Sequence, residues 1–207
     1  MDWGSIVSVI TALLVAILLP LALRKRKKAG PQNVEQLFHH LQGIGVRVSL
    51  LEKDVEQGKV RGKRSWGQRS EGVIRVEGRN IDCINVASVT SQYGVNYFLD
   101  YLVSSPGGTV RKNRKKTRMI RKKSSGLRGR VVDIQWKGDD YLSRQLSFDY
   151  ELKDRLLQAE LDKLKGSIWI SPEPKYEYAK VRTAYLLPSS DLFEAIDIIA
   201  KYVKSGW

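Results

Sequence analysis

The chain has 207 residues, of which 42% are hydrophobic and 28% charged, a globular composition that excludes general disorder. Its net charge of +14 is uneven, because residues 24–130 hold 25 Lys and Arg against 8 Asp and Glu, whereas residues 131–207 hold 11 against 13. This asymmetry indicates an anionic partner. Cys83 is the one cysteine, which excludes an intramolecular disulfide and a zinc site built from cysteines.

The first element in the chain is an apolar run, residues 5–23, that contains no charged residue. As a helix it would span about 28 Å, close to the ~30 Å hydrocarbon core of a bilayer. A cleaved signal peptide is the alternative, but signal peptides begin with basic residues, and this chain begins with Met-Asp-Trp-Gly. The run therefore predicts an uncleaved transmembrane helix.

A basic cluster follows the apolar run directly and opens a predicted juxtamembrane linker, residues 24–33. Basic residues mark the cytoplasmic end of a membrane span, so we expect the N-terminus outside and the C-terminal domain in the cytoplasm. The sequence thus predicts a single-pass protein of the cell membrane. The cluster would also attract anionic lipid headgroups. It consists of Arg24, Lys25, Arg26, Lys27 and Lys28.

Residues 34–72 are predicted to form a short helix, a short strand and a basic loop. The helix shows apolar residues at helical spacing, namely Val34, Leu37, Phe38 and Leu41. Residues 44–52 have the alternation of a strand. Residues 56–72 contain several glycines and basic residues, which is typical of a loop.

A folded domain is predicted over residues 73–207, beginning with strands at 73–78 and 81–89. Residues 91–105 are predicted to be a helix, because apolar residues recur on one helical face. Residues 129–136 alternate as a strand. The helical face consists of Tyr93, Phe98, Leu99, Leu102 and Val103.

The C-terminal third predicts two helical regions separated by a β-hairpin. Residues 140–165 carry a leucine stripe with a break near 147–151, and Asp139 or Asp140 is expected to cap its start. Residues 166–187 are predicted to form a β-hairpin. Residues 189–206 form the last predicted helix, with Asp191 and Glu194 resembling a capping box.

Together these elements predict the α+β class: one N-terminal transmembrane helix, then a cytosolic domain with a mainly antiparallel sheet and helices on one face. A repeat of strand, helix and two strands, at about 81–136 and 132–187, is a further hypothesis, although the two segments show no residue-level match.

Catalytic and metal-binding motifs are not found in the sequence. His39 and His40 are adjacent, so on a helix they point about 100° apart and cannot coordinate the same metal ion. The acidic groups near Asp139 and Asp149 fit helix capping and a charged surface. We therefore predict no cofactor, no metal and no enzyme activity.

The basic run 111–123 and the residues just after it are the candidate binding site. The run holds nine basic residues in thirteen and no acid, as either an ordered strand or a loop. Together with the cluster at 24–28, we predict that these side chains meet phosphate groups at a membrane surface. They are Arg111, Lys112, Arg114, Lys115, Lys116, Arg118, Arg121, Lys122, Lys123, Arg128 and Arg130.

The predicted function is a membrane-anchored, non-catalytic binding, scaffold or sensor domain with its basic segments, 24–28, 59–69 and 111–130, towards anionic lipid. The alternative is a membrane-tethered nucleic-acid-binding protein, whose phosphate contacts would be salt-dependent. The absence of aromatic residues from the 111–123 run counts against that alternative, since single-strand binding adds stacking aromatics. A membrane-bound enzyme of another type is the third reading. A protein partner and the oligomeric state stay open.

Overall fold

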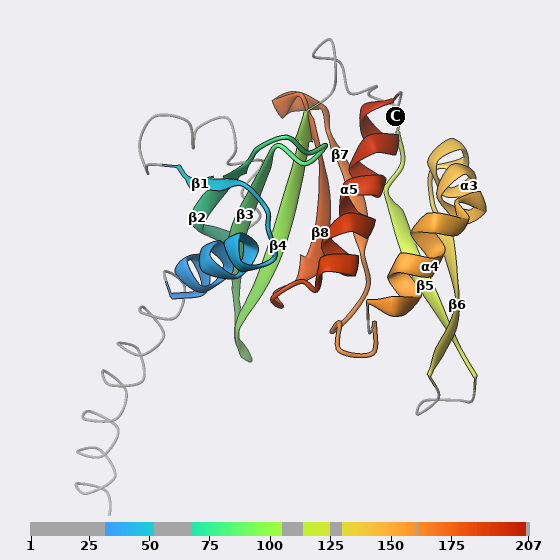
Figure 1. Cartoon of the computed structure of the whole chain (residues 1–207), viewed down its shortest axis with the longest axis horizontal. Helices are drawn as coiled ribbons and strands as arrows, with labels where there is room; N and C mark the ends of the chain where they lie inside the picture. Colours follow the sequence, from blue (N-terminus) through green and yellow to red (C-terminus); the bar gives the residue numbers. More distant parts are fainter. Residues whose placement is uncertain (1–31, 52–67, 105–113, 125–129, 160, 206–207) are drawn as a thin grey trace, which may run out of the picture.

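The computed structural model describes residues 32–51, 68–104, 114–124, 130–159 and 161–205 (Figure 1). In this part of the chain, eight strands form one antiparallel sheet in the order β1-β2-β3-β4-β8-β7-β5-β6. The strands are β1 (Val48–Leu50), β2 (Gln68–Val76), β3 (Cys83–Ser91), β4 (Gly94–Ser104), β5 (Thr117–Lys123), β6 (Val131–Lys137), β7 (Trp169–Glu173) and β8 (Tyr178–Ala184). The helices are residues 32–43, α3 (Asp140–Phe148), α4 (Tyr150–Gln158), the 3-10 helix η1 (Pro174–Tyr176) and α5 (Ser190–Lys204).

The predicted fold class needs correction in its membrane-spanning part. Among the described residues, no helix combines the length and the apolar character that crossing a membrane requires. The observed architecture is an antiparallel sheet with helices, and the description as a single-pass membrane protein is not supported. The predicted span, residues 5–23, lies outside the described residues, and residues 32 and 33 of the predicted linker already belong to a helix.

The helices lie on one side of the sheet, and the core forms between them and that side (Figure 1). Alternate residues of the strands point into this layer, because side chains along a strand alternate between the two faces. Met119 of β5 is 2% exposed and belongs to this core, so the basic run contains an ordered strand. The strand residues of the core include Ile84, Leu99, Val181, Ile170, Met119 and Trp136.

Helix boundaries follow side-chain caps. Asp139 accepts a hydrogen bond from the Leu142 backbone N–H at the start of α3, and Asp149 does the same for α4, which confirms the predicted break. At the start of α5 the cap is Ser189, which accepts from the Leu192 N–H, so the predicted role of Asp191 is wrong.

The helix predicted over residues 91–105 is wrong, because this segment is β4. Nine residue pairs join β3 to β4, from Cys83 opposite Leu102 to Ser91 opposite Gly94. Gly94 has φ +130°, a backbone conformation that a residue with a Cβ rarely adopts, and it opens the strand after the tight turn. The predicted duplication depended on this helix and is therefore wrong as well. The predicted loop 56–72 also ends early, since β2 begins at Gln68.

Candidate anion-binding site

Half of the predicted binding residues lie in the described chain, on or near β5 and β6. They are Arg114, Lys115, Lys116, Arg118, Arg121, Lys122, Lys123 and Arg130. The others lie outside the described residues, namely Arg24, Lys25, Arg26, Lys27, Lys28, Arg111, Lys112 and Arg128. Of the predicted basic segment 59–69, Arg69 is described and lies exposed on β2. Five strand spacings, about 24 Å, separate β2 from β5, so Arg69 is remote from the 111–123 run.

Arg114 holds the junction between β6 and α3. Its Nη1 lies 3.4 Å from the Oδ1 atom of Asp139, and its guanidinium lies 5.3 Å from the ring centroid of Tyr141. Asp139 also accepts from the backbone N–H groups of Lys115 and Leu142. These contacts assign Arg114 a structural role.

Arg121 is also held by internal contacts, but these are to carbonyls. Its Nη1 donates to the carbonyl oxygens of Leu161, at 2.6 Å, and Leu164, at 3.1 Å, and its Nη2 donates to that of Gly166, at 2.5 Å. A carbonyl satisfies a donor without cancelling a charge. Arg121 therefore places a fixed positive charge beside the turn that precedes β7.

Lys122 lies opposite Asp133 in the β5–β6 pair and forms an ion pair with it. Asp133 also accepts a hydrogen bond from Lys153 of α4, with an N···O distance of 2.7 Å. The contact with Lys153, followed by the Ile134 backbone N–H, lowers the pKa of Asp133 to about 2. The charge of Lys122 is thus compensated within the fold.

A row of seven residues crosses the sheet in register on the face opposite the helices. Directly opposed residues of antiparallel strands share a face, so the successive pairs define one line from β2 to β6. We call it the cross-strand row: Val73, Asn85, Asp100, Arg182, Trp169, Arg118 and Lys137.

The part of the row on β3, β4 and β8 is compensated internally, and we call Asn85, Asp100 and Arg182 the compensated half. Arg182 donates twice to Asp100, from Nε at 2.6 Å and from Nη2 at 2.7 Å. Burial alone would lower the pKa of Arg182, but bonding to the Asp100 carboxylate raises it above its usual value. Asn85 accepts a hydrogen bond from Ser70 at 2.6 Å.

The part on β7, β5 and β6 has no such balance, and we call Trp169, Arg118 and Lys137 the uncompensated half. Arg118 and Lys137 are exposed and directly opposite each other, an arrangement in which like charges repel. No carboxylate of the described residues forms an ion pair with either side chain. The Arg118 guanidinium lies 5.6 Å from the ring centroid of Trp169.

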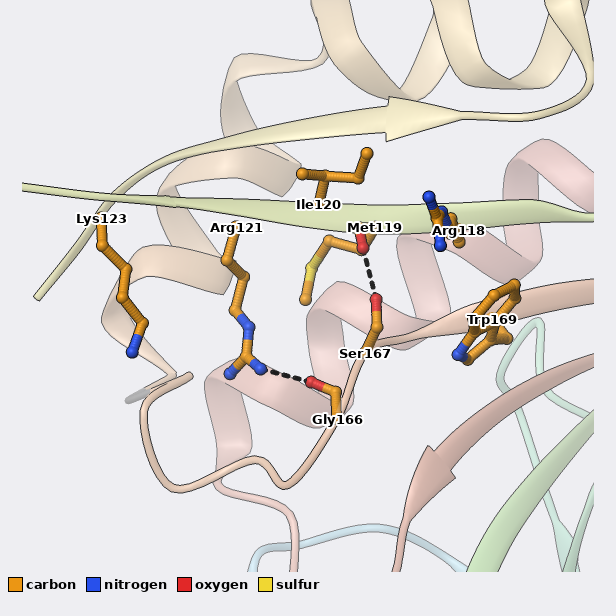
Figure 2. A pocket seen from close by; sticks show the side chains of 8 residues that line it. All are labelled: Arg118, Met119, Ile120, Arg121, Lys123, Gly166, Ser167 and Trp169. Atoms are coloured by element: carbon orange, nitrogen blue, oxygen red, sulfur yellow. Dashed lines mark hydrogen bonds between the residues drawn. The ribbon is translucent and has the colours of Figure 1, made fainter. Parts of the chain in front are cut away.

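A pocket opens beside the uncompensated half, between β5 and the turn before β7 (Figure 2). It is shallow and open to solvent, with a volume of about 740 Å³. Figure 2 shows Arg121 and Lys123 on the same side of β5 as Ser167 and Gly166, while Trp169 lies at the Arg118 end. Three lining residues are basic and none is acidic. The lining residues are Arg118, Met119, Ile120, Arg121, Lys123, Gly166, Ser167 and Trp169.

The pocket exists because β5 and β7 separate after a short contact. They pair only through Thr117 opposite Ile170 and Arg118 opposite Trp169. Beside them, the Met119 N–H donates to the Ile168 carbonyl at 2.9 Å, and the Ser167 hydroxyl donates to the Met119 carbonyl. The chain then bends away at Gly166, whose φ of +84° suits glycine. The bend leaves the pocket beside the rest of β5.

Sequence reasoning grouped the basic residues by proximity along the chain and therefore missed the partners from other strands. Trp169 and Ser167 lie about fifty positions after Arg118. Lys137 comes directly after residues 129–136, which were predicted to be a strand from their apolar alternation and were not considered part of the binding site. The aromatic side chain that the 111–123 run lacks is supplied by β7. No local signal in the sequence points to this pairing, since strand order across the sheet fixes it.

Comparison with protein-family models, curated proteins and solved structures finds no match to this chain. Within the described ranges, no group of three or more His, Cys, Asp or Glu is placed to hold a metal ion.

Proposed function

We propose that this protein is a non-catalytic binding protein that contacts anionic phospholipid headgroups through the β5–β7–β6 part of the face opposite the helices. The observation that carries the proposal is the direct opposition of Arg118 and Lys137, with no described carboxylate paired to either. An anionic surface would relieve that repulsion, and each basic residue near such a surface contributes about 1 kcal/mol of attraction.

A nucleic acid is the second candidate, and Trp169 is the observation that favours it. Single-strand binding uses aromatic faces on which bases stack, and Trp169 is 39% exposed beside two cations. However, the Arg118 guanidinium already occupies one face of its indole ring, at 5.6 Å from the centroid. Arg118 would have to move for a base to stack there, whereas a headgroup phosphate can bind with Arg118 in place.

The test is sedimentation of the full chain with vesicles of phosphatidylcholine alone and with added phosphatidylglycerol, at low and high salt. Lys116→Gln with Lys137→Gln removes two exposed charges beside the proposed surface. Arg144→Gln with Lys201→Gln removes the same charge from α3 and α5 on the helical side. The apolar run 5–23 is present in every sample, so only the difference between the vesicle types reports on charge.

We expect anionic lipid to increase binding, with a loss of about tenfold in the first double variant. The second should lose less than about twofold, because its charges lie on the other side of the sheet. Equal losses in the two variants would contradict the proposed surface. Tight binding of single-stranded DNA together with no dependence on anionic lipid would replace the proposal with the nucleic-acid alternative.

A further inference from the structure

We infer that the pocket between β5 and the turn before β7 is a subsite for a phosphate monoester. This inference rests on the proposed function and names the headgroup chemistry that the surface selects. The terminal phosphate could belong to a lipid headgroup or to a small soluble phosphate ester, since the recognised group is the same.

The pocket offers a ligand several hydrogen-bond donors. Arg118 carries five N–H donors, and no described residue accepts a hydrogen bond from them. Arg121 uses its guanidinium on three carbonyls, which leaves part of its donor set available. Trp169 adds an indole N–H, and the Ser167 hydroxyl proton is already donated to the Met119 carbonyl.

Three cations line the pocket, Arg118, Arg121 and Lys123, and the lining residues include no Asp or Glu. A site of donors and positive charge selects a ligand made of acceptors and negative charge. A carboxylate offers two oxygens and one charge. A phosphate monoester offers three unsubstituted oxygens and a charge of about −1.5 to −2 near neutral pH.

A monoester and a diester differ in their charge and in their number of unsubstituted oxygens. A phosphodiester, as in phosphatidylglycerol or a nucleic-acid backbone, has one charge and only two unsubstituted oxygens. Because three carbonyls fix its guanidinium, Arg121 can contact only a ligand that binds next to it. Arg118 is exposed and lies at the other end of the pocket, over Trp169 (Figure 2). A phosphate monoester brings more negative charge and one more acceptor oxygen to this acid-free, basic lining than a diester does, which gives the monoester the advantage.

The experiment measures binding of the full chain to vesicles that contain phosphatidic acid or phosphatidylglycerol, adjusted to equal zeta potential. We expect about fivefold tighter binding to phosphatidic acid, and competition by glycerol 3-phosphate. Arg118→Gln should abolish this preference and weaken binding to phosphatidic acid about tenfold. Lys116→Gln, two residues earlier and outside the pocket, should keep the preference. Circular dichroism of both variants verifies that they fold.

Each remaining outcome has a distinct meaning. Equal binding to the two lipids, with similar losses in Arg118→Gln and Lys116→Gln, would overturn the monoester subsite and leave the proposed anionic surface standing. No gain from either anionic lipid, with glycerol 3-phosphate still bound and Arg118→Gln defective, would support the subsite and overturn the lipid function. A further arm compares single-stranded DNA with and without a 5′-phosphate. Tight binding that ignores the 5′-phosphate would contradict monoester selection.

Discussion

The two halves of the cross-strand row share one face of one sheet, yet their charges have opposite consequences. In the compensated half, the Asp100 carboxylate is 2% exposed and bonded twice by Arg182, so its charge stabilises the fold. In the uncompensated half, Arg118 and Lys137 face each other in solvent, so their charges oppose folding and are available to a ligand. The comparison shows that a count of basic residues does not identify a binding site, whereas their partners do.

The same distinction applies within the 111–123 run. Arg114 forms an ion pair with Asp139, and Lys122 forms one with Asp133. Arg121 donates to backbone carbonyls, so all three basic residues stabilise the fold. Arg118 differs from them because the residue opposite it on β6 is Lys137, another cation, and no carboxylate. A substitution that weakens the internal contacts should therefore reduce stability without reducing binding, and a substitution at the exposed cations should do the reverse.

The largest expected effect comes from Gly138→Ala, which breaks the strand end that presents Lys137. Gly138 has φ +140°, and an added Cβ would lie 2.0 Å from the Lys116 carbonyl oxygen. We expect a loss of more than about 3 kcal/mol in the free energy of unfolding, measured by urea denaturation. Gly166→Ala is the matched control, since its φ is +84° but a Cβ would meet no atom within 4 Å. It should cost only about 1 kcal/mol. Similar costs for the two would refute the close approach at Gly138.

The next effect tests the compensated half. Asp100→Asn removes the negative charge while keeping the size of the side chain, and it leaves Arg182 partly buried without its counter-charge. We expect a loss of about 3 kcal/mol in unfolding free energy, since breaking a buried ion pair leaves one charge uncompensated. Binding to anionic vesicles should not fall when it is measured at a temperature where the variant is folded. A loss below about 0.5 kcal/mol would show that this half is not stabilised by its ion pair.

A smaller effect concerns Asp133, the carboxylate that compensates Lys122. Its pKa is lowered to about 2 in the folded chain, so its contribution to stability is complete above about pH 4 and is lost as the pH falls towards 2. The contribution is about 1 kcal/mol, as expected for partly exposed ion pairs. The difference in unfolding free energy between the wild-type protein and Asp133→Asn should therefore shrink over that range. A difference that stays constant between pH 6 and pH 2.5 would contradict the assigned ion pairs.

The sequence predicted those elements whose signals are local. The cap at Asp139, the helix break near residues 147–151, the β7–β8 hairpin and α5 depend on neighbouring residues, and the structure confirms them. The segment 91–105 was misassigned because its apolar residues match a helical face by chance. Its strand conformation depends on partners that are distant in the sequence. Asp100, for example, bonds to Arg182, which lies 82 positions later in the chain.

The candidate site was predictable only in part for the same reason. The sequence located the basic run, but the side chains that separate binding from structural roles come from β6, β7 and the turn before β7. The register between β5 and β7 covers just two residue pairs, too few to leave a recognisable pattern. The membrane-spanning part of the prediction rested on residues 5–23, outside the described ranges, and the described helices do not support it.

The most direct test of the difference between the two halves is Lys137→Glu, with stability and anionic-vesicle binding measured on the same protein sample. The change converts a like-charge pair opposite Arg118 into an opposite-charge pair. We predict a gain of about 0.5 kcal/mol in unfolding free energy together with at least about tenfold weaker binding to anionic vesicles. Lower stability, or binding equal to that of the wild-type protein, would contradict the conclusion that Arg118 and Lys137 are kept uncompensated for an anionic partner.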